Sequence, residues 1–294
     1  AYYASLQYAK ERPQGRKILN SGKKDVSEGQ TLIINHPDVR RMLLLQKAIV
    51  EGALSLLLEC SKYSDIAHCD TNETKSNHHL LLEFLTPIAK TYPSEMGRIA
   101  INNGLQVLGG YGYCMDFPLQ QYLRDIRIMA IYEGTTGIQS LDLLGRKIPM
   151  ENGKALQLLT AQMMPTINEA KKYENLTANA DILSDKMGEI QKVLTYLMPY
   201  AAKGDYENYL ADATVFMEMA SNIIIGHQWL KMAIVAQEAI LNDEKVFETS
   251  FYESKIHTMK FYFKYELPKT KACLETILHQ DKLTLADESS ELIF

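Results

Sequence analysis

Cysteine is scarce in this chain, and the few cysteines show neither the close spacing of a zinc site nor the density of a disulfide framework. The four are Cys60, Cys69, Cys114 and Cys273. Scattered cysteines of this kind are typical of reduced thiols, so we expect a cytoplasmic protein. The histidines at 68, 78 and 79 lie near Cys69, but adjacent histidines on a helix point to different sides. A metal site is therefore not expected.

A long apolar run is also missing. No uninterrupted stretch approaches the ~20 residues that a membrane span needs. A basic excess is absent too, because the formal net charge is -5, and general nucleic-acid binders normally carry a positive balance. We therefore expect neither a membrane span nor a nucleic-acid partner. The 46% hydrophobic content belongs to an ordinary globular protein, and 294 residues suffice for about two domains.

Alternating strand patterns of useful length are missing, whereas helical periodicity is present along most of the chain. Apolar residues at 42, 45, 49, 53 and 56 recur at steps of three and four, and so do those at 252, 256, 259 and 263. Pro149 and Gly153 interrupt the pattern. These features predict an all-α protein with a helical domain over residues 1–150 and a second helical domain over 151–294.

Turn and capping residues predict where the helices begin and end. The first helix is expected to end near Arg12, before Pro13, and a second to begin at Pro37. Three more helices are expected: one over 78–108, a shorter one after Pro118, and one over 136–147. Connections are expected over 20–30, 175–177, 202–205 and 242–244. The first residues already show helical spacing without a capping residue or initiator Met before them. We therefore expect this chain to be a fragment of a longer protein.

One stretch carries candidate chemistry. Gly109-Gly110-Tyr111-Gly112 is followed, after an apolar run, by Glu133 and Gly134. Glycines let backbone N–H groups approach a phosphate closely, and a carboxylate in apolar surroundings accepts a proton more readily than a solvated one. Alternatively, the glycines form only a helix cap and turn, and the glutamate is a solvated residue at a helix start. Only the combination of the two motifs favours function.

The same residues resemble a known family. Gln106–Tyr113, Tyr122–Asp125 and Ile131–Thr136, with Ile138-Gln139 after them, are similar to the C-terminal signature of the flavin-dependent acyl-CoA dehydrogenases. The likeness runs over more than thirty positions in register. Two further phrases, over 36–44 and 141–147, resemble the branch with a long C-terminal extension that contains the 3-methylmercaptopropionyl-CoA dehydrogenases. The resemblance implies a C-terminal domain of four-helix-bundle type followed by a second helical extension.

The resemblance also implies a reaction and a cofactor. Family members remove the α proton of an acyl-CoA thioester with a base while the β hydride passes to FAD. Glu133 matches the base of the short- and medium-chain type. Tyr132 and Gly134 match residues beside the substrate thioester, and Thr135 matches a residue that contacts the flavin. An electron acceptor such as an electron-transfer flavoprotein is implied as well.

Three more positions match residues that meet the flavin of a partner subunit. Arg12 resembles the arginine that neutralises the pyrophosphate, and Gln106 and Gly110 resemble residues at the adenosine end. A homodimer or homotetramer is therefore implied. The family also needs a β domain and an N-terminal helical domain, which these helical residues do not supply. We expect an enzyme fragment that is inactive alone; the alternatives are a non-enzymatic helical scaffold and an acyl-CoA oxidase.

Overall fold

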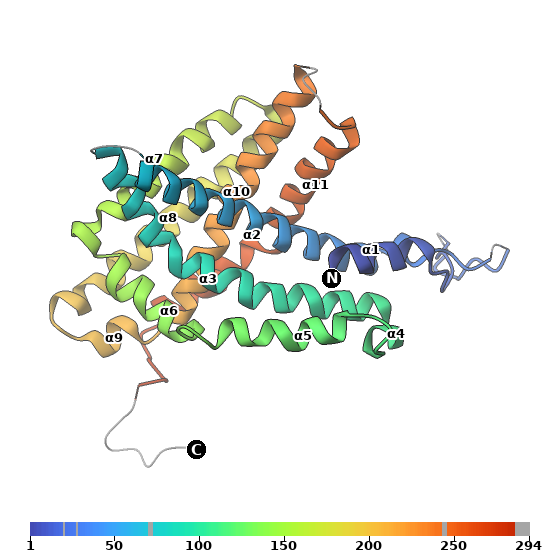
Figure 1. The fold of residues 1–294 in the computed structure, drawn as a ribbon, viewed down its shortest axis with the longest axis horizontal. Helices are drawn as coiled ribbons and strands as arrows, with labels where there is room; N and C mark the ends of the chain where they lie inside the picture. The colour runs from blue at the N-terminus through green and yellow to red at the C-terminus, as the bar shows by residue number, and fades with distance from the viewer. Residues whose placement is uncertain (20, 28, 70–72, 243–245, 286–294) are drawn as a thin grey trace, which may run out of the picture. The chain divides into compact units, whose positions relative to one another are not determined.

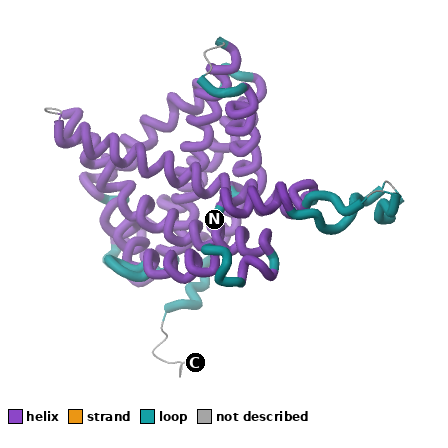
Figure 2. The backbone as a smooth tube through the Cα atoms, turned by 45° about the vertical axis from the view of Figure 1, so that its right-hand side comes forward, coloured by secondary structure: helices purple, strands orange, loops and turns teal. Residues whose placement is uncertain are grey.

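The computed structural model describes all residues except 20, 28, 70–72, 243–245 and 286–294 (Figure 1). The described residues form helices joined by short connections, and no strand is drawn among them in Figure 2. The all-α prediction is therefore confirmed. The helices of the first half are α1 (Tyr2–Glu11), α2 (Pro37–Cys69), α3 (Glu73–Leu108), α4 (Gly110–Tyr113), α5 (Leu119–Arg127) and α6 (Thr136–Asp142).

The second half continues the same pattern. Its helices are α7 (Met150–Ala170), α8 (Glu174–Ala202), α9 (Tyr206–Leu210), α10 (Ala213–Leu241), α11 (Thr249–Tyr265) and α12 (Thr270–Leu278). Four short turns complete the described elements: η1 (Ile33–Asn35), η2 (Ile128–Ala130), the π-helical η3 (Leu143–Lys147) and η4 (Leu267–Lys269). No described helix is long and apolar enough to cross a membrane.

The chain folds into two compact units that do not follow sequence order. Unit 1 contains Ala1–Ala53 and Tyr92–Tyr132, and unit 2 contains Leu54–Thr91 and Glu133–Phe294. Helices α2 and α3 each contribute one part to unit 1 and the other part to unit 2. The predicted domains, 1–150 and 151–294, are continuous in sequence, unlike these two units, and the boundary near residue 150 stays a prediction.

Unit 1 is built on the first part of α2. Pro37 occupies its first position, where the missing N–H costs nothing, and Asp38 complements the positive helix end. Unit 1 has an apolar core of Ala9, Ile33, Met42, Leu43 and Val107. The buried Ser5 hydroxyl donates a hydrogen bond to Gln46 Oε1 at 3.0 Å, which joins α1 to α2.

A connection is predicted over 20–30, and its described residues form a mostly exposed loop without a helix. The loop belongs to a short hairpin-like excursion between α1 and η1, with isolated antiparallel bridges between Pro13 and Leu32 and between Ile18 and Lys24. The N–H of Gln14 donates to the carbonyl of Thr31 at 2.9 Å, which closes the base of the excursion. Arg12 lies where α1 ends, as predicted, and is held next to this base.

Unit 2 is organised around α10. This helix is apolar on nearly all sides, and such helices lie inside a core rather than on its surface. It packs against α7, α8, α11 and α12, and Figure 1 shows α8 and α11 beside it. Trp229 and Tyr262 are fully buried in this core.

A cluster of polar side chains lies within unit 2, where α2, α7 and α10 supply its members. Lys231 Nζ lies 2.6 Å from Glu59 Oε1, and Tyr63 donates to the same oxygen at 2.8 Å. Gln228 donates to the other carboxylate oxygen of Glu59. Burial alone would raise the pKa of Glu59, but the Lys231 charge and the hydrogen bonds from Lys231, Gln228 and Tyr63 outweigh it, and the pKa is lowered.

Several predicted boundaries move in the structure. The connection expected at 175–177 is wrong, because these residues form the first turns of α8 and the connection is 171–173. The predicted connection at 202–205 is confirmed, whereas most of the one at 242–244 lies outside the described residues. Helix α3 begins five residues before the predicted His78. The helix expected over 136–147 is present, and its last part widens into the π-turn η3.

Candidate functional site

The residues around Glu133 form a strained turn. Glu133 has φ +50° and Gly134 has φ +92°, so two consecutive residues adopt left-handed backbone conformations. For a residue with a Cβ, this conformation costs roughly 1–2 kcal/mol. At Gly134 a Cβ would lie 2.8 Å from Gln139 Nε2, so a side chain does not fit there without a shift. Strain of this kind persists only where the surroundings hold the backbone.

Three contacts hold the turn. Lys90, on α3, donates from Nζ to the carbonyl of Gly134 at 2.6 Å. Gln139, on α6, donates from Nε2 to the carbonyl of Glu133 at 3.2 Å. Thr135 is the N-cap of α6, and its hydroxyl accepts a hydrogen bond from the N–H of Ile138 at 3.3 Å. The backbone that carries Glu133 is therefore fixed from two helices.

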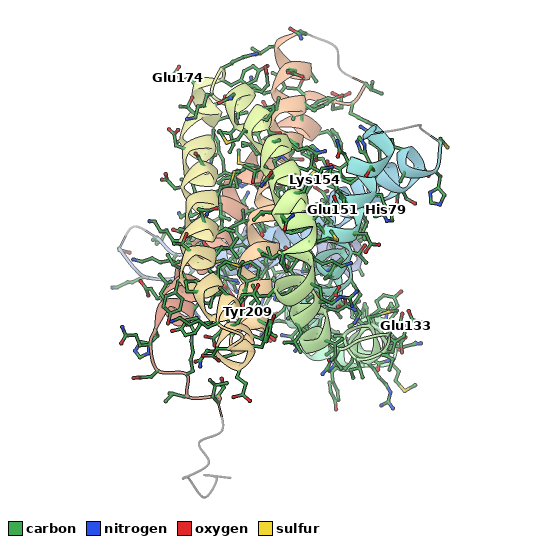
Figure 3. All side chains as sticks on the ribbon, turned by 90° about the vertical axis from the view of Figure 1, so that its left-hand side faces the viewer. His79, Glu133, Glu151, Lys154, Glu174 and Tyr209 are labelled. Carbon is green, nitrogen blue, oxygen red and sulfur yellow. The ribbon has the colours of Figure 1, made fainter. Side chains whose placement is uncertain are left out.

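The surroundings of Glu133 differ from the expectation. The sequence predicts an apolar enclosure, but the Glu133 side chain is exposed in this chain (Figure 3). Its apolar neighbours are exposed too, for example Met129 at 45% and Tyr132 at 46%. The described residues of this chain therefore present the carboxylate on a surface instead of enclosing it. The enclosure expected from the sequence is wrong for this chain by itself.

The Gly-rich turn forms a second candidate region, within unit 1. Gly109 has φ +60°, and a Cβ at Gly109 or Gly110 would meet no atom within 4 Å. Beside the turn is a groove of about 440 Å³. Its lining includes Tyr8, Gln14, His36, Gln106 and Gly109. The backbone at this turn is open to a close approach by another molecule, and the neighbouring side chains offer hydrogen-bonding groups.

Arg12 lies close to the same turn. Its guanidinium carbon is 5.7 Å from the centroid of the Tyr111 ring, which follows Gly110. Among the described residues, Arg12 has no side-chain hydrogen bond or ion pair. The structure therefore brings three predicted residues, Arg12, Gln106 and Gly110, to one region of unit 1. Glu133, Gly134 and Thr135 form the turn in unit 2, and Tyr132 is the last residue of unit 1.

The histidines near Cys69 are not arranged as a metal site. His68 uses Nδ1 in a contact of 2.6 Å with the carbonyl of Ser64, and the His78 ring packs against Tyr63 with centroids 5.4 Å apart. Within the described part of the chain, no group of three or more His, Cys, Asp or Glu residues is placed to hold a metal ion.

Comparison with known proteins places these features in a family. Residues 1–148 match the family model described as the acyl-CoA dehydrogenase C-terminal domain. The chain belongs to the acyl-CoA dehydrogenase family. Residues 159–287 of this family member match a second model, described as acetyl-CoA dehydrogenase C-terminal like. The resemblance inferred from the sequence signature is thereby confirmed.

Curated relatives agree with the extended branch. The chain is 31% identical over 291 residues to a broad-specificity linear acyl-CoA dehydrogenase of Mycobacterium tuberculosis, covering 94% of this chain and 46% of that protein. It is 32% identical over 266 residues to the 3-methylmercaptopropionyl-CoA dehydrogenase of Ruegeria pomeroyi, covering 89% of this chain and 43% of the relative. This chain therefore spans somewhat less than half the length of these relatives.

A solved structure agrees with the fold. The acyl-CoA dehydrogenase of Bacillus anthracis in complex with FAD superposes with a TM-score of 0.69 at 16% identity. The match covers 94% of this chain and 45% of that one. At this identity the similarity concerns the fold alone.

Two residues of the candidate site were not predicted. The sequence pattern assigns no role to Lys90, although a lysine at the end of the mainly apolar stretch 84–89 of α3 is a usable signal. Gln139 stands out in the sequence only as part of the family signature. Both act through main-chain carbonyls, and a sequence pattern does not reveal which carbonyl a side chain will reach.

Proposed function

We propose that this chain is the C-terminal part of an FAD-dependent acyl-CoA dehydrogenase and that Glu133 is its catalytic base. The observation that carries the proposal is the exposed carboxylate of Glu133 on a left-handed turn held by Lys90 and Gln139. The left-handed backbone alone does not distinguish Glu133, because the exposed Glu151 shares it; the side chains of Lys90 and Gln139 that hold the turn do. The family and the names of the relatives support the same reaction.

In the proposed reaction the Cα–H bond of an acyl-CoA thioester breaks and the proton passes to the Glu133 carboxylate. The electron pair left on Cα forms the Cα=Cβ double bond as a hydride leaves Cβ. FAD, when bound, accepts that hydride. Glu133 must therefore face one side of the substrate, and Tyr132 and Gly134 are proposed to lie beside the thioester. The exposed position of Glu133 is consistent with a site completed by further protein.

The residues of unit 1 fit one end of a dinucleotide. Arg12 offers a guanidinium without an ion pair among the described residues, which suits a pyrophosphate. Gln106 lines the neighbouring groove, and the backbone of Gly110 has free space beside it. We propose that these three residues contact FAD and that Thr135 contributes a second contact. Following the family pattern, the first three serve the FAD of a partner subunit.

Assembly, electron transfer and location belong to the same proposal. A site shared between subunits requires a homodimer or homotetramer. An electron-transfer flavoprotein is the proposed electron acceptor, and one curated relative is a subunit of a caffeyl-CoA reductase–Etf complex of Acetobacterium woodii. The scattered cysteines, which form no disulfide among the described residues, support the proposed cytoplasmic location.

The test uses the complete enzyme that carries this chain. Its FAD content is measured, and a panel of saturated acyl-CoAs is assayed with an artificial electron acceptor and with oxygen. The Glu133→Gln variant is expected to lose about 10²–10⁴-fold in turnover, the usual contribution of a general base, and to keep its FAD. Glu151→Gln is the matched control, because Glu151 is also an exposed glutamate with a left-handed backbone, φ +48° (Figure 3).

Three outcomes contradict parts of the proposal. Turnover that survives in Glu133→Gln refutes the role of Glu133 as the base. If the complete protein contains no FAD and shows no turnover, the proposal that it is an enzyme is refuted and a helical scaffold is favoured. If turnover with oxygen equals turnover with the artificial acceptor, the protein is an acyl-CoA oxidase and the assignment as a dehydrogenase is refuted.

A further inference from the structure

The position of the Glu133 carboxylate depends on two peptide groups. The side chain leaves the main chain at a residue with φ +50°, and the next residue has φ +92°. The direction in which the Glu133 side chain leaves the main chain therefore depends on the turn that contains the Glu133–Gly134 and Gly134–Thr135 peptide groups. Both must keep an unusual orientation for the carboxylate to stay in place.

One donor holds each of these peptide groups. Gln139 Nε2 donates to the Glu133 carbonyl at 3.2 Å, and Lys90 Nζ donates to the Gly134 carbonyl at 2.6 Å. The Lys90 bond is charge-assisted and partly buried, which makes it the stronger of the two. Gln139 belongs to the helix that starts at the turn, whereas Lys90 comes from α3, 44 residues earlier in the chain. Lys90 thus joins the turn to a separate, long helix.

We propose that Lys90 is a positioning residue for α-proton abstraction, with Gln139 as its weaker counterpart. This inference rests on the proposed function, because it gives Lys90 its role through Glu133. The ammonium fixes the peptide group after Gly134, the amide fixes the one before it, and the carboxylate keeps its aim at Cα. A displacement of about 1 Å at a reacting group costs on the order of 10²-fold in rate. Lys90 itself touches neither substrate nor cofactor in this role.

A purely structural role for Lys90 predicts different behaviour. A lysine that only stabilises the turn would affect melting temperature, FAD content and turnover together. A positioning lysine affects the proton-abstraction step while binding and folding stay near normal. The two roles are therefore separated by measuring proton abstraction apart from turnover.

The experiment uses the complete FAD-bound enzyme and a 3-thiaacyl-CoA of the best chain length from the acyl-CoA panel. Sulfur replaces Cβ in this probe, so no hydride is available and only the Cα–H bond breaks. The proton passes to Glu133 and is exchanged with solvent deuterium, and NMR follows the loss of the α-proton signal. Turnover of the ordinary acyl-CoA is measured in parallel for kcat and KM.

Lys90→Met is expected to lower α-proton exchange and kcat about 10²-fold, with KM within about threefold of the native value. FAD content should not change. Lys90→Arg keeps a charged donor, so its α-proton exchange and kcat should be at least tenfold higher than those of Lys90→Met. Lys192→Met is the matched control, because Lys192 is an exposed lysine on α8, and it should exchange the α proton at the native rate.

Opposite results separate this inference from the proposed function. Native exchange in Lys90→Met, together with lost exchange in Glu133→Gln, refutes the role of Lys90 and leaves Glu133 as the base. Native exchange in Glu133→Gln refutes the proposed function itself. If Lys90→Met does not fold, Gln139→Leu decides. A fall of about tenfold in exchange with unchanged FAD content supports the inference, and native exchange overturns it.

Discussion

The ion pair between Lys231 and Glu59 allows a quantitative prediction. Replacing Lys231 by Met keeps most of the aliphatic side chain and removes the charge that lies 2.6 Å from Glu59 Oε1. The Glu59 side chain is only 14% exposed, whereas that of Lys231 is 39% exposed. The variant therefore leaves a mostly buried carboxylate with hydrogen bonds from neutral groups only.

The expected cost lies between two limits. Two unit charges about 4 Å apart attract each other by about 4 kcal/mol at an effective dielectric constant of about 20. Because Lys231 is partly solvated, about half of this attraction is expected to survive screening. Removing one partner of a fully buried pair costs about 3–5 kcal/mol, and an exposed pair contributes at most about 1 kcal/mol. We expect Lys231→Met to lower the free energy of unfolding by about 2 kcal/mol at pH 7.

The cost should depend on pH. Glu59 has a lowered pKa in the native protein, so its contribution to stability is present above the unfolded pKa of 4.5 and is lost as pH falls through the lower folded value. Without Lys231 the effect of burial is opposed only by hydrogen bonds, and the pKa of Glu59 rises relative to the native protein. The carboxyl group of the variant is then protonated at a higher pH than that of the native protein, and the stability difference between the two proteins should shrink as pH falls from 7 to 3.5.

Urea unfolding followed by circular dichroism measures the difference at pH 7 and at pH 3.5. Lys192→Met, on the exposed side of α8, serves as the control and should stay within about 0.5 kcal/mol of the native protein. Glu59→Gln should cost less than Lys231→Met, because the amide still accepts a hydrogen bond and the remaining ammonium is partly solvated. A loss that is equal at both pH values would refute the electrostatic reasoning, and so would a loss below 0.5 kcal/mol at pH 7.

Two further predictions concern buried groups of unit 2. Burial, with a smaller effect of Lys231, lowers the pKa of His227 to about 4, so stability should fall by up to about 3 kcal/mol as pH drops from 6.5 to 4. His227→Gln should lack this loss in the same urea assay, and an unchanged pH dependence would contradict the assignment. Tyr209, labelled in Figure 3, donates a hydrogen bond to the Leu144 carbonyl in η3 at 2.7 Å. Tyr209→Phe should cost about 1–2 kcal/mol, whereas Tyr206→Phe, at an exposed tyrosine, should cost less than about 0.5 kcal/mol.

The sequence predicted those parts of the structure that depend on residues close to one another in the chain. Pro13 ended α1 and Pro37 began α2 as expected, because proline restricts its own φ and the residue before it. The periodic apolar residues of α11 are buried as predicted. The connection at 175–177 was wrong, because asparagine and threonine also occur in the first turns of helices, and their composition does not distinguish a loop from a helix start.

In the candidate site, too, the sequence predicted what neighbouring residues determine and missed what distant residues determine. The signature around Glu133 located the turn in the sequence. Its left-handed conformation at a glutamate was not predicted, because only glycine signals that conformation by residue type. The contact from Lys90 depends on the packing of α3 against the turn, and no pattern local to either segment encodes it. The predicted apolar enclosure failed because apolar neighbours in sequence do not guarantee apolar neighbours in space.

The interleaving of the two units has a consequence for biosynthesis. Residues 54–91 include Leu56, Leu81, Phe84 and Ile88, which are buried in the finished structure. The central helix of their unit, α10, ends at Leu241 and leaves the ribosome only after roughly 150 more residues, which take on the order of 10–30 s at ordinary rates of synthesis. During that interval the nascent chain carries apolar helix faces without their final cover. A binding site for a chaperone of nascent chains is therefore expected in residues 54–91 before α10 emerges.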